Sequence, residues 1–160
     1  MRIKKLENNI IAKIAAGEII ENPSSVIKEL IDNCIDALAT NIEIEFQNGG
    51  KDYIRVSDNG TGIIFEDLKI AFSRHATSKL NSVKNISTIE SMGFRGEALP
   101  SIATVSNVEL ISNVSSESHA GKINLEYGSI LNVKPDVRTK GTTVVVTNLF
   151  GNMPARRNFL

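Results

Sequence analysis

The first clear pattern along the chain is an amphipathic helix between residues 22 and 39. Asn22 followed by Pro23 is typical of a helix start, because asparagine caps free amides and proline fits the first turn. Strong helix formers then continue to about Ala39. At 3.6 residues per turn, one side is apolar, with Ile27, Leu30, Ile31, Cys34 and Leu38, and the other is polar, with Ser25, Glu29, Asp32, Asn33 and Asp36. We therefore expect a helix that packs through its apolar side.

A hairpin is predicted directly after this helix. Residues 41–47 alternate between polar and apolar side chains, which is typical of a half-buried strand. The sequence Asn-Gly-Gly at residues 48–50 predicts a turn, and residues 53–58 return as a second strand. Asp58 ends this strand and shares the face of its apolar residues. Its carboxylate therefore needs a partner.

The remaining elements predict the fold class. We expect helices at residues 65–72 and 97–105, a polar loop at 73–85, and strands at 108–112, 122–126, 129–133 and 142–147. Helices early in the chain and consecutive strands later are typical of an α+β fold. The prediction is one domain, residues 1–160, built as a two-layer α/β sandwich in which helices cover one face of a mixed, largely antiparallel sheet.

Composition excludes several classes of function. Lys plus Arg and Asp plus Glu number 18 each, so no bulk positive field exists to hold DNA by phosphate neutralisation alone. The single cysteine, Cys34, excludes an internal disulfide and fits a reducing compartment. No stretch is apolar and long enough for a signal core or a membrane span. We expect a soluble cytoplasmic protein with no membrane partner.

Two candidate sites arise from the first helix and the strand after it. Glu29 and Asn33 are four residues apart on one helical face, where a carboxylate can hold a water and an amide oxygen can ligate a cation. An ordinary solvated stripe is the alternative. Asp58 begins the run Asp-Asn-Gly-Thr-Gly at residues 58–62, and a carboxylate beside such a turn suits an exocyclic amine such as that of adenine. A capped tight turn is the alternative there.

Two further segments suit phosphate. Residues 93–97, Gly-Phe-Arg-Gly-Glu, run into a predicted helix, so amide donors and the helix dipole can face phosphate oxygens. Thr77, Ser78 and Lys79 add hydroxyls and an ammonium group on a loop. A helix-entry loop and a solvated loop are the alternatives. The sequence contains no Gly-x-x-x-x-Gly-Lys phosphate loop, protein-kinase catalytic loop or Gly-x-Ser-x-Gly elbow.

In this order the segments resemble the four motifs of the ATPase superfamily shared by DNA gyrase, the Hsp90 chaperone, sensor histidine kinases and MutL, the fourth being Gly-Thr-Thr at residues 141–143. The MutL branch, from bacterial DNA mismatch repair, is similar also through residues 14–20, 74–79, 93–99 and 154–157. The resemblance covers essentially the whole chain and implies the Bergerat, or GHKL-type, ATP-binding fold. Leu38 departs from it, because MutL-like sequences usually carry glycine there, as does Met153, where threonine is commoner.

The resemblance implies a site for ATP and Mg²⁺. Glu29 would be the general base toward the attacking water, Asn33 the Mg²⁺ ligand and Asp58 the reader of the adenine amine. Thr143 would assist in binding the adenine base. The other implied nucleotide-binding residues are Ala37, Gly62, Thr77, Ser78, Lys79, Gly93, Phe94, Arg95, Gly96, Glu97, Ala98 and Leu99.

The resemblance also implies a switch in DNA mismatch repair. ATP binding would dimerise two copies of this domain, and the partners would include a MutS-like mismatch sensor, a downstream nuclease or helicase, and DNA bound largely outside these residues, at the bacterial nucleoid. The family's ATPase module continues into a second subdomain with a lysine for the terminal phosphate, and a carboxy-terminal domain dimerises the protein. We expect the 160 residues to lack both, and hydrolysis by them alone to be weak or undetectable.

Two other functions stay open at this stage. A phosphotransferase of the histidine-kinase type would use the same pocket to modify a partner histidine. A non-enzymatic module for DNA or protein would rely on Arg156 and Arg157, the clustered arginines near the end of the sequence.

Overall fold

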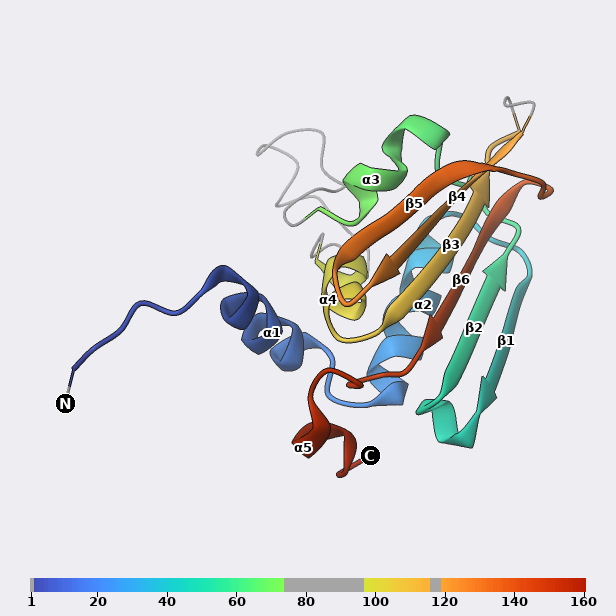
Figure 1. The fold of residues 1–160 in the computed structure, drawn as a ribbon. Helices are drawn as coiled ribbons and strands as arrows, with labels where there is room; N and C mark the ends of the chain where they lie inside the picture. The colour runs from blue at the N-terminus through green and yellow to red at the C-terminus, as the bar shows by residue number, and fades with distance from the viewer. Residues whose placement is uncertain (1, 74–96, 116–118) are drawn as a thin grey trace, which may run out of the picture.

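The computed structural model describes residues 2–73, 97–115 and 119–160 and shows a sheet of six strands covered by helices on one face (Figure 1). The strands are β1 (Ile42–Gln47), β2 (Tyr53–Asp58), β3 (Asn107–Asn113), β4 (Ala120–Glu126), β5 (Ser129–Asp136) and β6 (Gly141–Thr147). Their order across the sheet is β1-β2-β6-β3-β4-β5. All five pairings are antiparallel, which confirms the predicted α+β class and the largely antiparallel sheet.

Short helices make up the second layer. They are α1 (Asn8–Ile19), α2 (Pro23–Asp36), α3 (Leu68–Ala71), α4 (Ala98–Thr104) and α5 (Pro154–Arg157), with 3₁₀ turns η1 (Asn48–Gly50) and η2 (Phe65–Asp67). Helix α2 packs on β2, α3 on β4, and α4 on β3 and β4, whereas α1 packs mainly on α4. None of these helices, nor any other in the described ranges, is both long and apolar enough to cross a membrane.

The core lies between the two layers. One face of the central strands is largely buried, as the alternating burial of β2, β3 and β6 shows. Ile54, Leu110 and Val146 contribute from the sheet, and Leu30 and Ile102 from the helices. This alternation means that even-numbered residues of β2 and β6 point toward the helices and odd-numbered ones point away from them.

Helix α2 begins where the sequence predicts, and the Asn22 side chain accepts a hydrogen bond from the Ser25 amide at 3.0 Å. Its burial differs from the prediction at two residues. Asp32, predicted on the polar side, is only 4% exposed, and its carboxylate binds the Lys28 ammonium at 2.8 Å. Leu38, predicted on the apolar side, is 76% exposed because the helix ends at Asp36 and the chain turns outward.

Two further elements differ from the sequence prediction. Strand β1 is mostly exposed rather than half-buried, since it lies at the edge of the sheet; Ile44 and Phe46 face the helix side but are 40% and 59% exposed. Helix α1 was not predicted at all. It has no side-chain cap, and Ile10, Ile11 and Ile14 are exposed, so its residues carry a weak amphipathic pattern.

Candidate functional site

Asp58 ends β2 with its carboxylate buried against helix α2. The residue is 9% exposed and lies on the face of the buried Ile54 and Val56, as predicted. Its Oδ1 accepts the Gly60 amide at 2.7 Å, and its Oδ2 accepts the Cys34 thiol at 3.3 Å. Both donors are neutral. Two carboxylate oxygens offer about four acceptor positions, so this arrangement leaves capacity for a further donor.

Cys34 belongs to this site through its contact with Asp58. Burial, followed by the charge of Asp58 and the hydrogen bond to it, raises the pKa of the thiol to about 12. The thiol therefore keeps its proton at neutral pH and donates a hydrogen bond to the carboxylate. Cys34 also belongs to the hydrophobic core, which agrees with its predicted packing role. Sequence reasoning did not connect it to Asp58, because the two residues are far apart in the chain.

The turn after Asp58 is pressed against the end of α2 and the end of β3. The Thr61 amide donates to the Ala37 carbonyl at 2.9 Å, and a Cβ on Gly60 would lie 2.7 Å from that same oxygen. Gly62 has φ +76°, and a Cβ there would lie 2.0 Å from the Asn113 carbonyl oxygen. Both positions therefore require glycine. The structure thus places Ala37, Asp58 and Gly62 together.

Glu29 and Asn33 lie on α2, the helix whose C-cap residue Ala37 contacts this turn. They are one helical turn apart and both are half-buried. Asn33 directly precedes Cys34, whose thiol contacts the Asp58 carboxylate at the end of β2, so α2 brings Asn33 near that strand end. In the part of the chain that the structure describes, no hydrogen bond or ion pair engages the Glu29 carboxylate. That carboxylate is available to hold a water.

The predicted role of Thr143 disagrees with the strand geometry. Thr143 pairs with Ser57 across the β2–β6 ladder, and their hydroxyl oxygens are 2.8 Å apart on the face that points away from the helices. Thr142 is the threonine on the helix side, with its Oγ1 2.7 Å from the Ser112 Oγ. The Ser112 hydroxyl in turn accepts the amide of Ile63, next to Gly62. The buried Val144 and Val146 already indicated this in the sequence, because their face is shared by position 142.

The predicted phosphate-binding residues fall largely outside the described residues, namely Thr77, Ser78, Lys79, Gly93, Phe94, Arg95 and Gly96. Glu97 precedes α4 as its N-cap residue, and its carbonyl accepts the Ser101 amide at 2.9 Å. Ala98 is buried, and Leu99 packs against the core. What these two residues can offer a phosphate is therefore their backbone amides, which belong to the first turn of the helix.

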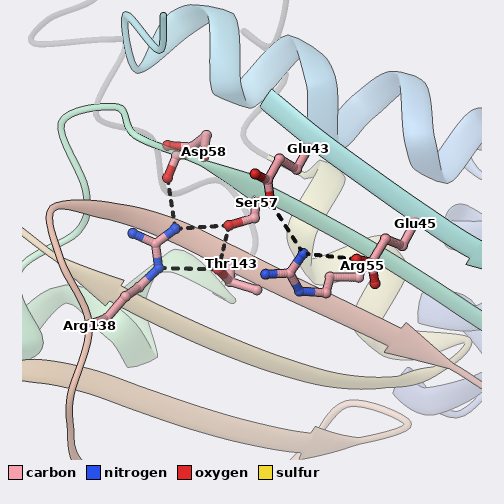
Figure 2. Close-up of polar contacts among 7 residues, drawn as sticks. All are labelled: Glu43, Glu45, Arg55, Ser57, Asp58, Arg138 and Thr143. Carbon is pink, nitrogen blue, oxygen red and sulfur yellow. Dashed lines mark hydrogen bonds and ion pairs between the residues drawn. The ribbon is translucent and has the colours of Figure 1, made fainter. Parts of the chain in front are cut away.

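Arg138 is a residue of this region that sequence reasoning missed. It precedes β6 and reaches under the sheet, on the face opposite the helices, toward Ser57, Asp58 and Thr143 (Figure 2). Its guanidinium donates to the Asp58 carbonyl at 2.7 Å, to the Ser57 hydroxyl at 3.1 Å and to the Thr143 hydroxyl at 3.1 Å. Burial, together with nearby Arg55, lowers the pKa of Arg138, whereas Asp58 acts in the opposite direction. No local motif marks an arginine in a loop for this role.

Two other features lie apart from Asp58. A cleft of about 350 Å³ lies between α1, α4 and the β4–β5 hairpin, lined among others by Lys13, Phe72 and Tyr127, and it includes none of the predicted site residues.

Arg156 donates to the carbonyls of Gly17 and Ile20, and Arg157 to those of Lys51 and Leu149. Both arginines thus hold the chain's own backbone.

The family model for "Histidine kinase-, DNA gyrase B-, and HSP90-like ATPase" matches residues 20–146. The DNA mismatch repair protein MutL of Fervidobacterium nodosum is 49% identical over 99% of this chain and 26% of its own length. That of Xanthomonas campestris pv. campestris is 48% identical over 100% of this chain and 26% of its own length. The chain therefore spans about a quarter of these relatives.

Solved structures show the same fold. The Aquifex aeolicus MutL ATPase domain complexed with ADP is 37% identical, with a TM-score of 0.72 over 89% of this chain and 48% of that chain. The N-terminal domain of a DNA repair protein is 35% identical, with a TM-score of 0.76 over 93% of this chain and 42% of that chain. The chain therefore belongs to the histidine kinase-, DNA gyrase B- and HSP90-like ATPase family, within which it is similar to the MutL proteins of DNA mismatch repair.

Proposed function

We propose that this chain is the ATP-binding and ATP-hydrolysing domain of a MutL-like DNA mismatch repair protein. The observation that carries the proposal is the buried Asp58 carboxylate, which is held by the Gly60 amide and the Cys34 thiol with acceptor capacity left over. An adenine amine is a donor that this carboxylate can bind, through a charge-assisted hydrogen bond of about 1.5–3 kcal/mol. The ADP complex of the Aquifex aeolicus relative supports the same class of ligand.

The residues of α2 would serve the phosphate end of the nucleotide. Asn33 can offer an amide oxygen to Mg²⁺, an ion that usually takes few protein ligands and several from water and phosphate. Bound Mg²⁺ would neutralise phosphate charge. Glu29, one turn away and without a partner in the described parts of the chain, would orient the attacking water and take its proton. Such a base contributes roughly 10²–10⁴-fold to the rate.

The wider biological role is also proposed. In the complete protein, ATP binding would dimerise two copies of this domain and couple a MutS-like mismatch sensor to a downstream nuclease or helicase, with DNA bound largely elsewhere. The chain covers 26% of the length of two MutL relatives, and in the complete protein a further ATPase subdomain and a dimerisation domain would complete the switch. Turnover is therefore to be measured in the complete protein, and binding in the 160-residue chain.

Binding and turnover test the two assignments separately. In calorimetric titration with Mg²⁺ and a non-hydrolysable ATP analogue, Asp58→Asn should weaken binding by about tenfold to a hundredfold, because the amide cannot replace a charged acceptor. Asp52→Asn is the matched control, since Asp52 pairs with Arg157 at the far end of β2. In the complete protein, Glu29→Ala should keep nucleotide binding and reduce turnover by at least about a hundredfold.

Two results would contradict the proposal. Equal affinity of the parent chain and Asp58→Asn would remove the adenine assignment. Normal ATP hydrolysis by Glu29→Ala would show that another group is the base.

A further inference from the structure

Arg138 connects the face of the sheet that carries no helices to the strand end that bears Asp58. It donates to two successive residues of β2, the Ser57 hydroxyl at 3.1 Å and the Asp58 carbonyl at 2.7 Å. It also donates to the neighbouring strand through the Thr143 hydroxyl at 3.1 Å. Its fourth acceptor is the Thr139 carbonyl, at 3.0 Å, within its own loop. The guanidinium therefore fixes β2 and β6 to each other at the point where β2 ends.

The surrounding backbone is shaped to admit this arginine. Gly141 opens β6 with φ +126°, and a Cβ there would lie 2.1 Å from the Asp58 carbonyl and 2.7 Å from the Arg138 guanidinium. The Asn113 side chain donates to the Arg138 carbonyl at 2.8 Å. The Asn113 carbonyl, in turn, occupies the space that a side chain on Gly62 would need. Arg138 is thus linked to both the carboxylate residue and the glycine turn of the candidate site.

The position of the positive charge also matters. The hydrogen bond from Arg138 to Asp58 goes to the backbone carbonyl, whereas the carboxylate points to the other face, toward Gly60 and Cys34. The cation can orient the residue without occupying the carboxylate oxygens. A carboxylate that is held in position while its oxygens stay available is what recognition of an amine requires.

We propose that Arg138 is a positioning residue that sets the selectivity of Asp58 for adenine from the opposite face of the sheet, an inference that rests on the proposed nucleotide site. Adenine carries an amine at C6, which can donate a hydrogen bond to the carboxylate. Hypoxanthine carries a carbonyl oxygen there, which is itself an acceptor and cannot form that hydrogen bond. A correctly aimed carboxylate discriminates between these bases, and a displaced one discriminates less.

The test compares Mg-ADP with Mg-IDP, the hypoxanthine nucleotide, on the 160-residue chain by calorimetric titration. The parent should bind ADP at least about tenfold more tightly than IDP. Arg138→Ala should reduce this ratio by at least about threefold, and Arg138→Lys should restore part of it, because an ammonium keeps the charge but makes fewer directed bonds. A change that only destabilised the fold would weaken the binding of both nucleotides equally and leave the ratio of the two affinities unchanged.

Arg55→Ala is the matched control. Arg55 lies on the same strand and the same face as Ser57, and its guanidinium pairs with Glu43 at 3.8 Å and Glu45 at 3.7 Å (Figure 2). Removing it should leave the ADP to IDP ratio unchanged. An unchanged ratio in Arg138→Ala, with the parent selective for ADP, would overturn the role of Arg138 alone. A parent that binds neither nucleotide, or both equally, would overturn the proposed adenine site and this inference with it.

Discussion

Leu38 stands at a backbone position that suits glycine. Helix α2 ends with the amide of Leu38 bonded to the Ile35 carbonyl at 3.0 Å and the amide of Ala39 bonded to the Cys34 carbonyl at 3.1 Å. This is the Schellman pattern, in which the residue after the C-cap is left-handed and is usually glycine. Leu38 adopts φ +60° and is 76% exposed. The backbone strain at Leu38 arises from its left-handed conformation, and burial of the side chain does not offset it.

Replacing Leu38 by glycine should therefore stabilise the domain. A left-handed backbone costs a residue with a Cβ about 1–2 kcal/mol, and the larger freedom of glycine in the unfolded chain returns part of it. The expected gain in the free energy of unfolding is about 0.5–1 kcal/mol, measured by urea unfolding. Leu38→Ala keeps the strain and should show no such gain. A gain of equal size in both variants would place the effect in the lost side chain instead.

Single residues also show where sequence reasoning succeeds. The alternation of side chains along residues 53–58 predicts that Asp58 shares the face of Ile54 and Val56, and the structure confirms it. The same alternation along β6 would have chosen Thr142 over Thr143. Arg138 and Cys34 could not be found this way, because their roles depend on contacts with residues that lie far away in the sequence. Periodicity predicts the face of a residue, and only the tertiary fold brings its partners to it.

Helix α5 holds the carboxy-terminal end of α1 in place through Arg156. Arg156 donates to the Gly17 carbonyl at 2.9 Å and the Ile20 carbonyl at 3.2 Å, and its guanidinium lies 4.8 Å from the centre of the Phe150 ring. A Cβ on Gly17 would lie 2.6 Å from the same guanidinium, so the absence of a side chain makes room for it. The end of α1 is thus held by a residue from the other end of the chain.

Arg156→Ala should release the end of α1. Two hydrogen bonds from a charged donor are lost, and because the arginine is partly exposed we expect a cost of about 1–2 kcal/mol. Hydrogen exchange of the α1 amides should become faster, while that of β2 and β6 changes little. Arg157→Ala is the control, since Arg157 donates to Lys51, Leu149 and Asp52 instead. Equal acceleration of α1 exchange in both variants would contradict a specific anchor.

This anchoring explains why α1 was missed. Its exposed isoleucines blur the amphipathic pattern, and its N-cap residue Glu7 makes no side-chain cap. Ala16 and Ile20 are nevertheless fully buried, through contacts supplied by the rest of the fold. By contrast, α2 has a capped start that is visible in the sequence. Elements with strong local signals were predicted, and those stabilised by tertiary contacts were not.

For the whole molecule, the fold class followed from the order of helices and strands, but the order of strands in the sheet did not. Strand β6 is the last in sequence, yet it lies between β2 and β3. The β1–β2 hairpin and the β3–β4–β5 meander each pair locally, as their short connections predict. Among the strands of the described residues, β6 alone joins them, and no local pattern identifies a strand that inserts between two others.

Removing β6 should therefore abolish the fold rather than weaken it. A chain of residues 1–140 loses Val144, Val146, Leu149 and Phe150, which are all buried. Each such side chain contributes about 1.5–3 kcal/mol, and together they match the whole stability of a typical domain, ~5–15 kcal/mol. Thermal circular dichroism should show no cooperative transition. A chain of residues 1–153, which lacks only α5 and the last residues, should still unfold cooperatively. Cooperative unfolding of residues 1–140 would contradict this view.

The position of β6 between β2 and β3 also bears on how the chain folds during its synthesis. Until residues 141–147 have been synthesised, the hairpin and the meander lack the strand that joins them, which leaves the edges of β2 and β3 unpaired. Such edges invite pairing with other nascent chains, so this interval is the one in which a chaperone would be of most use. Once β6 is available, its pairing with β2 and β3 covers both of these edges and joins the hairpin and the meander into one sheet.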